Sequence, residues 1–307
     1  MLTSRLTRIA ATAALAAAIA VATTFPSLAA DIVVAHAQGE TTVAQNPARV
    51  VTFDYAALDT LDALGVDIIG LPGTNLPDYL AEYGDDRYLK LGSIFEPDYE
   101  AVAAAEPDLI IVAGRSSTAY PELSRIAPTI DLSNDWTDFE GSIKANSKIL
   151  GEIFGKTAEV DALIATLDAK TAAVKAKAAT AGKGLIVLTS GGEVTAYGTG
   201  SRFGWIHESL GVEPAIADVQ AATHGDAISF EFILETNPDW LFVIDRDAAT
   251  GEGSAAAILD NELVAQTTAW ANQQVVYIDP VRSYIVNGGL PAFIALVDQV
   301  AAALGAE

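Results

Sequence analysis

Residues 157–180 read TAEVDALIATLDAKTAAVKAKAAT, and this stretch carries the clearest helical pattern in the chain. Its larger apolar residues follow the i, i+3, i+4, i+7 spacing of one helical face, and alanine fills most other positions. They are Val160, Leu163, Ile164, Leu167 and Val174. We expect Thr157 to cap the start, and the lysines near the end suit the negative pole of the helix dipole. The pattern predicts one continuous helix of about 36 Å.

The sequences on either side of this helix repeat one unit. Each copy has a glutamate, a Pro-Asp turn seven residues later, the pattern of a buried strand, and an arginine eight residues after the proline. The copies are Glu100, Pro107 and Arg115 in the first half, and Glu231, Pro238 and Arg246 in the second. The repeat indicates two similar lobes.

Strand patterns alternate with helix patterns, which indicates α/β lobes with parallel sheets. The second half also opens with a hairpin pattern, in which Gly191-Gly192 joins strands at 184–189 and 194–197. Ligands of such sheets bind at the carboxyl ends of strands, where the repeat places Arg115 and Arg246. We expect an N-terminal α/β lobe over residues 30–155, a linking helix over 156–182 and a C-terminal α/β lobe over 183–307. The predicted fold is therefore two Rossmann-like lobes joined by a single long helix.

The first thirty residues have the composition of an export signal. Arg5 and Arg8 precede an apolar run, and a small-residue cleavage site follows, so we expect residues 1–29 to be removed after Ala29. The chain contains no cysteine, which excludes disulfides, thiolate metal sites and a lipid-anchoring cysteine. These features predict a free protein of the periplasm.

The chain is strongly acidic, with 17 Lys and Arg against 40 Asp and Glu and a formal net charge of −23. Loss of the two arginines in the signal segment would leave 15 basic residues. Nucleic acids and anionic membranes are therefore poor partners. An arginine at a sheet edge stands out here, because only a local cationic patch can attract an anion to such a protein.

A third arginine, Arg202, lies in a glycine-rich stretch, residues 198–204, which read GTGSRFG. The stretch nearly matches the dinucleotide-binding pattern, but its third glycine comes one residue late. We interpret it as a strand-to-helix loop that presents Arg202.

Several motifs together resemble the periplasmic siderophore-binding proteins of ATP-driven iron importers, most closely the CeuE-type group that takes ferric catecholates. They are NPARVV at 46–51, FDYAALD at 53–59, LGSIFEPD at 91–98, SRFG at 201–204, THG at 223–225 and VIDR at 243–246. The resemblance implies the class III periplasmic binding protein fold. It also implies a ferric siderophore as ligand, an inner-membrane ABC permease as partner, and no intrinsic cofactor, since Fe(III) arrives with the siderophore. We expect a monomer.

The resemblance also implies roles for individual residues. Arg115, Arg202 and Arg246 correspond to an anion-binding arginine triad. His224 and Tyr284 correspond to side chains that ligate the iron, and Glu100 and Glu231 to glutamates that dock onto permease arginines.

The chemistry of the residues agrees with these roles. A ferric tris-catecholate is a trianion, and guanidinium is a permanently charged planar donor that also stacks on aromatic rings. A tetradentate bis-catecholate leaves two positions of octahedral iron open, which a phenolate and an imidazole can fill, so we favour that ligand. The plainer interpretation is that each arginine forms a surface ion pair and each glutamate only offsets a helix dipole.

Other functions remain open at this point. Receptors for another iron chelate, a hydroxamate, haem or cobalamin share the expected architecture, although a neutral hydroxamate complex does not need three arginines. A two-domain periplasmic enzyme is the alternative from another class. The sequence lacks a Gly-x-Ser-x-Gly elbow, a Walker loop, a His-Glu-x-x-His motif and any thiol, and has only three histidines.

Overall fold

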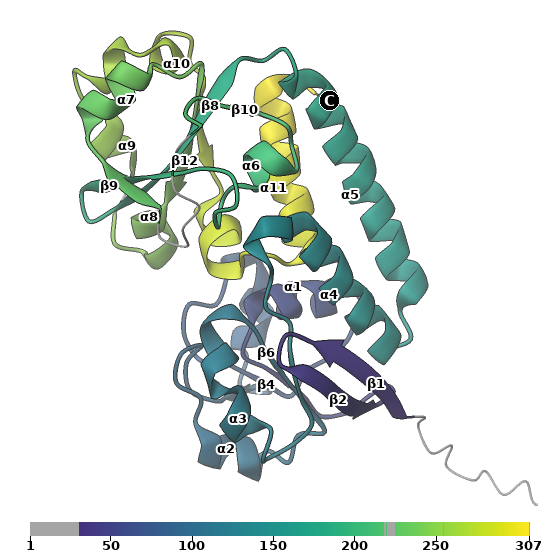
Figure 1. The fold of residues 1–307 in the computed structure, drawn as a ribbon. Helices are drawn as coiled ribbons and strands as arrows, with labels where there is room; N and C mark the ends of the chain where they lie inside the picture. Colours follow the sequence, from purple (N-terminus) through teal and green to yellow (C-terminus); the bar gives the residue numbers. More distant parts are fainter. Residues whose placement is uncertain (1–30, 218, 220–224, 254, 307) are drawn as a thin grey trace, which may run out of the picture.

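The computed structural model describes residues 31–217, 219, 225–253 and 255–306 and contains two α/β lobes, one above the other in Figure 1. Helix α5 (Thr157–Ala178) runs along one side of both lobes. Helix α11 (Leu290–Leu304) lies beside α5, and α4 (Phe139–Ile153) packs against the first half of α5.

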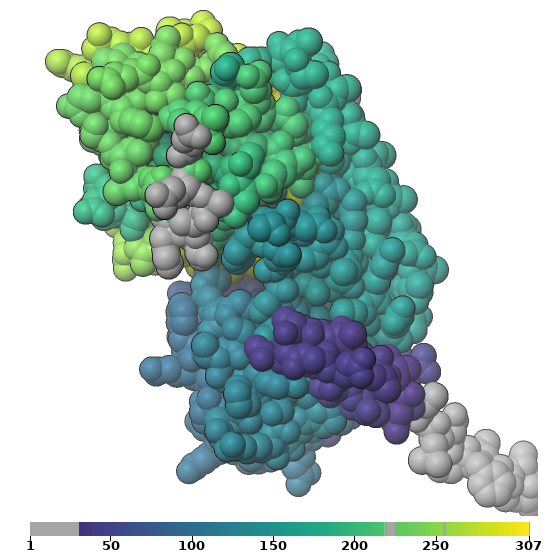
Figure 2. All heavy atoms as spheres, in the orientation of Figure 1, coloured from purple at the N-terminus to yellow at the C-terminus, as the bar shows by residue number. Residues whose placement is uncertain are grey.

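The N-terminal lobe is built on a five-stranded parallel sheet in the order β5-β4-β3-β6-β7. Its strands are β3 (Val50–Thr52), β4 (Gly70–Leu71), β5 (Leu89–Lys90), β6 (Leu109–Val112) and β7 (Thr129–Asp131). Its helices are α1 (Tyr55–Ala63), α2 (Tyr99–Ala104) and α3 (Tyr120–Leu123), with 3₁₀ turns at Asp78–Gly84, Gly114–Ala119 and Trp136–Asp138. The hairpin of β1 (Asp31–His36) and β2 (Gly39–Ala44) lies on the outside of this lobe (Figure 2).

The C-terminal lobe has a six-stranded mixed sheet in the order β11-β9-β8-β12-β13, with β10 paired to β8. Its strands are β8 (Lys183–Ser190), β9 (Glu193–Tyr197), β10 (Glu213–Pro214), β11 (Asp226–Ile228), β12 (Trp240–Asp245) and β13 (Val275–Ile278). Its short helices are α6 (Trp205–Glu208), α7 (Phe230–Thr236), α8 (Arg246–Thr250), α9 (Ala255–Leu259) and α10 (Thr268–Ala271), with a 3₁₀ turn at Val264–Gln266. The β8–β9 hairpin confirms the hairpin predicted at Gly191-Gly192, and together with the antiparallel β11, which the sequence did not predict, it makes this sheet mixed.

The long helix is continuous, and the stripe that predicted it faces the core. Val160, Leu167 and Val174 are fully buried. The helix starts at Thr157, so the expectation that Thr157 caps it is wrong. The tight turn after α4 puts Lys156 in the cap position, because Lys156 N donates to Gly151 O at 2.7 Å and Gly155 has a left-handed φ of 62°. The helix ends at Ala178, four residues before the expected boundary at 182.

Helix α11 is capped by side chains of the other lobe. Leu290 N donates to Thr60 Oγ1 at 3.2 Å, and Ala292 N donates to Asp59 Oδ2 at 2.9 Å. A Cβ at Gly289 would overlap the Asp59 carboxylate, so the close approach requires glycine there. The start of α11 is therefore fixed to α1, and the lobes are joined by more than α5.

The sequence predicts a loop around Tyr284 before the last helix, but this segment is helical in the structure. Residues Val281–Val286 form a π-helical turn, in which Asn287 N donates to Arg282 O. The Asp279 carboxylate stabilises its start by accepting from Arg282 N at 2.9 Å and pairing with the Arg282 guanidinium at 2.5 Å. Ile285 and Val286 are buried in the core of the N-terminal lobe.

No helix in the described part of the chain is long and apolar enough to cross a membrane.

Candidate functional site

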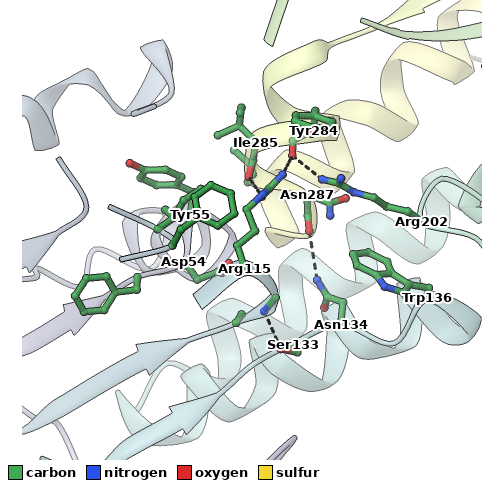
Figure 3. A pocket seen from close by; sticks show the side chains of 16 residues that line it. Asp54, Tyr55, Arg115, Ser133, Asn134, Trp136, Arg202, Tyr284, Ile285 and Asn287 are labelled. Carbon is green, nitrogen blue, oxygen red and sulfur yellow. Dashed lines mark hydrogen bonds between the residues drawn. The ribbon is translucent and has the colours of Figure 1, made fainter. Parts of the chain in front are cut away.

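A cavity of about 460 Å³ lies between the lobes, and Figure 3 shows the side chains around it. The N-terminal lobe contributes the carboxyl ends of β3 and β6 and the loops after β5 and β7. The C-terminal lobe contributes Arg202 and the π-helical turn. The lining residues are Phe53, Asp54, Tyr55, Ile94, Phe95, Ala113, Gly114, Arg115, Ser133, Asn134, Trp136, Arg202, Tyr284, Ile285, Val286 and Asn287.

Tyr284 is the residue on which the three predicted arginines converge. Arg115 donates to the Tyr284 carbonyl at 2.6 Å and to the Ile285 carbonyl at 3.2 Å. Arg202 donates to the same Tyr284 carbonyl at 2.8 Å. Arg115 reaches it from the N-terminal lobe and Arg202 from the C-terminal lobe, so this carbonyl joins both sides of the cavity.

Arg246 reaches the other end of Tyr284. Its Nε donates to the phenol oxygen at 3.0 Å, and its Nη1 donates to Ser190 Oγ at 2.6 Å. All three guanidinium carbons lie within 6 Å of the tyrosine ring, at 5.3 Å for Arg115, 4.5 Å for Arg202 and 5.9 Å for Arg246. The described residues that line the cavity do not include Arg246, which contacts the site through Tyr284.

The electrostatics of the cluster favour an anion. Burial, with Arg115 nearby, lowers the pKa of Arg202 to about 10. Burial opposes ionisation of the Tyr284 phenol, but the Arg246 hydrogen bond and the three positive charges outweigh it and hold its pKa below the ordinary value. The hydrogen bond with Tyr284 in turn raises the pKa of Arg246. The cluster thus stabilises negative charge at the phenol and beside it.

Each arginine is positioned by the end of a local element. Arg115 follows β6 in a 3₁₀ turn entered through Gly114, whose φ is 45°. Arg246 is the first residue of α8, directly after β12. Arg202 lies in the turn after β9, which is held by buried Phe203 and by a hydrogen bond of 2.6 Å from Gly200 N to Glu208. Arg115 and Arg246 therefore end equivalent strands of the two lobes.

Asp54 lies on the cavity wall at the carboxyl end of β3, and the sequence analysis did not assign it to the site. It caps α1 by accepting from Ala57 N at 2.7 Å. Burial raises the pKa of this carboxyl to about 6, against the opposing effects of its backbone hydrogen bonds and of Arg115. Phe95 and Asn134, which lie in loops, and Trp136, which starts a 3₁₀ turn, were also missed, because none of them is part of a periodic pattern.

The other predicted site residues lie elsewhere. His224 lies outside the described residues. Glu100 and Glu231 are exposed in the first turns of α2 and α7, one on each lobe, and neither lines the cavity. Among the described residues, no group of three His, Cys, Asp or Glu side chains is arranged to hold a metal ion.

Two α/β lobes that form a cavity at the carboxyl ends of their strands, spanned by one long helix, define a substrate-binding protein of class III architecture. The chain belongs to the periplasmic binding protein family, whose model matches residues 50–281.

Relatives of known specificity cover most of the chain. Petrobactin-binding protein YclQ of Bacillus subtilis is 42% identical over 264 residues, which are 85% of this chain and 83% of that protein. Its crystal structure superposes with a TM-score of 0.87 over 90% of this chain and 99% of that one. Ferric-anguibactin-binding protein FatB of Vibrio anguillarum is 35% identical over 88% of this chain and 86% of its own length. The catecholate-siderophore binding protein VctP of Vibrio cholerae is 34% identical, with a TM-score of 0.84 over 91% and 100% of the two chains.

Proposed function

We propose that this protein captures a ferric catecholate siderophore outside the cytoplasm and delivers it to an ABC permease of the inner membrane. The single observation that supports this most is the convergence of Arg115, Arg202 and Arg246 on Tyr284 in a protein with a net charge of −23. Guanidinium groups bind catecholate oxygens through charge-assisted hydrogen bonds and stack on catechol rings. Relatives whose names include petrobactin, anguibactin and catecholate siderophores support the same ligand class.

The size of the site is consistent with such a ligand. A cavity of about 460 Å³ falls within the usual range for small-molecule pockets. Its walls combine two arginines with apolar and aromatic side chains, which suits a ligand that is both anionic and aromatic.

The lowered pKa of Tyr284 supports a tetradentate ligand. A bis-catecholate leaves two iron positions open, and a phenol must lose its proton to fill one of them. The arginines around Tyr284 reduce the free-energy cost of that ionisation. His224 is proposed as the second donor on the family resemblance alone.

The delivery step is proposed to use Glu100 and Glu231. Each is exposed and is the second residue of its helix, which is capped by the side chain two positions earlier, Asp98 in α2 and Ser229 in α7. One such glutamate on each lobe can orient the protein on a permease that carries arginines. In this proposal the protein acts as an exported monomer, and it binds its ligand without chemically changing it.

Fluorescence titration of the protein tests the proposed ligand class. Trp136 lines the cavity and should report on occupancy. The panel is ferric bis-catecholate, ferric tris-catecholate, a ferric hydroxamate, ferric citrate and haem. The bis-catecholate should bind tightest. Preferred binding of the hydroxamate or haem would contradict the proposal, and turnover of a ligand would support the enzyme alternative.

A further inference from the structure

The loop between β5 and α2 is a closed turn that presents Phe95. Gly92 and Pro97 form an isolated antiparallel bridge, and Ser93 N donates to Glu96 O at 3.0 Å. Ser93 Oγ also accepts from Glu96 N at 3.0 Å and from Phe95 N at 3.3 Å. Gly92 has a φ of 95°, and a Cβ there would overlap the carbonyl oxygen of Glu96. The turn is therefore held at both ends, and Phe95 lies near its tip.

The phenyl ring of Phe95 is not used for packing. It is 60% exposed, whereas its neighbour Ile94 is 4% exposed in the core of the N-terminal lobe. Burying a phenylalanine side chain is favourable, so this exposed ring leaves apolar surface available to a partner.

Phe95 differs from the other exposed apolar side chains in its location. The large apolar side chains that are exposed in the described residues are Val33, Tyr79, Leu89, Phe95, Tyr99 and Tyr277. Of these, Phe95 alone lines the cavity between the lobes. A ligand in that cavity is therefore the partner that can cover it.

We propose that Phe95 is a contact surface of the N-terminal lobe for an aromatic ring of the ligand, and that it selects ferric siderophores with aromatic groups over purely aliphatic chelates. The inference rests on the proposed function and adds a specificity residue to it. The cluster around Tyr284 recognises negative charge, which citrate and catecholate chelates share. A phenyl ring has no hydrogen-bonding group, and stacking against a second aromatic ring stabilises the contact beyond the apolar area that it buries.

Tyr99 provides a matched control on the same segment. It is 40% exposed at the start of α2, only four residues from Phe95, and it does not line the cavity. Because Tyr99 lies outside the cavity, loss of its ring should leave the affinity for the ligand unchanged. Phe95 should behave in the same way if its ring served only to contact another protein.

The test measures the dissociation constants of ferric bis-catecholate and ferric citrate for wild type, Phe95→Leu, Phe95→Tyr and Tyr99→Leu. Leucine retains apolar surface but removes the ring. We expect Phe95→Leu to weaken binding about 3- to 10-fold and Phe95→Tyr to stay within about 2-fold of wild type. Tyr99→Leu should bind like wild type. All variants should unfold at the wild-type temperature, because neither ring is buried.

The outcomes separate this inference from the proposed function. If wild type binds ferric bis-catecholate and Phe95→Leu binds equally well, the aromatic contact is wrong and the proposed function stands. Equal weakening of ferric citrate and bis-catecholate by Phe95→Leu would also overturn it, because the ring would then lack selectivity. A wild type that binds no ferric catecholate removes both proposals.

Discussion

Arg246 Nε donates to the phenol oxygen of Tyr284 at 3.0 Å, while Arg115, its counterpart in the sequence repeat, donates to the carbonyl of the same residue. The arginines that end the two copies of the repeat thus contact the same tyrosine from opposite lobes. Tyr284 is therefore both a candidate iron ligand and the residue that holds the arginines in place.

Tyr284→Phe should separate these two roles, because it keeps the backbone carbonyl that accepts from Arg115 and Arg202 and removes only the hydroxyl group of the side chain. We expect ferric bis-catecholate to bind up to about tenfold more weakly. The change that binding causes in the visible charge-transfer band should become smaller. Tyr277→Phe, on a partly exposed ring outside the cavity, should leave both quantities unchanged. An unaltered spectrum of the bound complex in Tyr284→Phe would contradict coordination by the phenolate.

Asp59 should make the protein less stable as the pH rises from about 4 to 6. Burial raises its pKa to about 6 against the opposing hydrogen bonds from Ala292 and Tyr79 and the charge of Arg282, while Asp62 raises it further. The pKa of Asp59 in the folded protein lies above the ordinary aspartate value of 3.8, so the stability that its protonated form contributes is complete below pH 3.8 and is lost as the pH rises through 6. The difference corresponds to roughly 3 kcal/mol.

Two substitutions of Asp59 test this by urea unfolding. Asp59→Asn keeps hydrogen-bonding atoms for Ala292 and Tyr79 but cannot ionise, so its stability should exceed that of wild type at pH 7 and match it near pH 4. Asp59→Leu removes both acceptors and should be less stable than Asp59→Asn by about 1–3 kcal/mol at either pH. A gap between Asp59→Asn and wild type that does not change with pH would refute the titration of Asp59.

The lobes should move little when the ligand binds. Helix α5 is continuous from Thr157 to Ala178, and Asp59 and Thr60 hold the start of α11 against the N-terminal lobe. A hinge needs residues that can absorb large changes in backbone dihedral angle, and neither connection offers a free loop of this kind. Small-angle X-ray scattering should give nearly equal radii of gyration with and without ferric siderophore. A large decrease would contradict a rigid connection.

Glu100 and Glu231 should be needed for uptake and not for binding. Reversing both charges, with Glu100→Arg and Glu231→Arg, should abolish siderophore-dependent iron uptake and leave the dissociation constant unchanged, since neither residue lines the cavity. Glu82→Arg with Glu235→Arg makes the same charge change at other exposed positions and should permit uptake. Normal uptake with the first pair reversed would rule out the docking role.

The sequence predicted the parts of the fold that depend on periodicity. The apolar residues that predicted α5 and β12 are buried in the structure. The repeat correctly placed Arg115 and Arg246 at equivalent strand ends. In the C-terminal lobe the β8–β9 hairpin was predicted from Gly191-Gly192, whereas strand β11 was not predicted. The antiparallel pairing of β11 with β9 depends on contacts between distant segments, which no local pattern specifies.

The site was predicted in its residue types and not in its arrangement. The repeat placed Arg115 and Arg246 at strand ends, and the family resemblance assigned these two and Arg202 to one anion site. The π-helical turn that carries Tyr284 was missed because it depends on tertiary packing: Asp279 fixes its start, and the N-terminal lobe buries Ile285 and Val286. The cap that Asp59 provides for α11 was missed for the same reason, since residue 292 is far from it in sequence.

The most direct test of the account is the affinity of ferric bis-catecholate for arginine variants, followed by tryptophan fluorescence. Arg115→Ala, Arg202→Ala and Arg246→Ala should each weaken binding by about 1.5–3 kcal/mol, the scale of a charged hydrogen bond, and the triple variant should bind far more weakly than any of them. Arg125→Ala removes the same charge from an exposed ion pair with Glu122 and should have no effect. Wild-type affinity in the triple variant would contradict the account, because the ligand would then bind elsewhere.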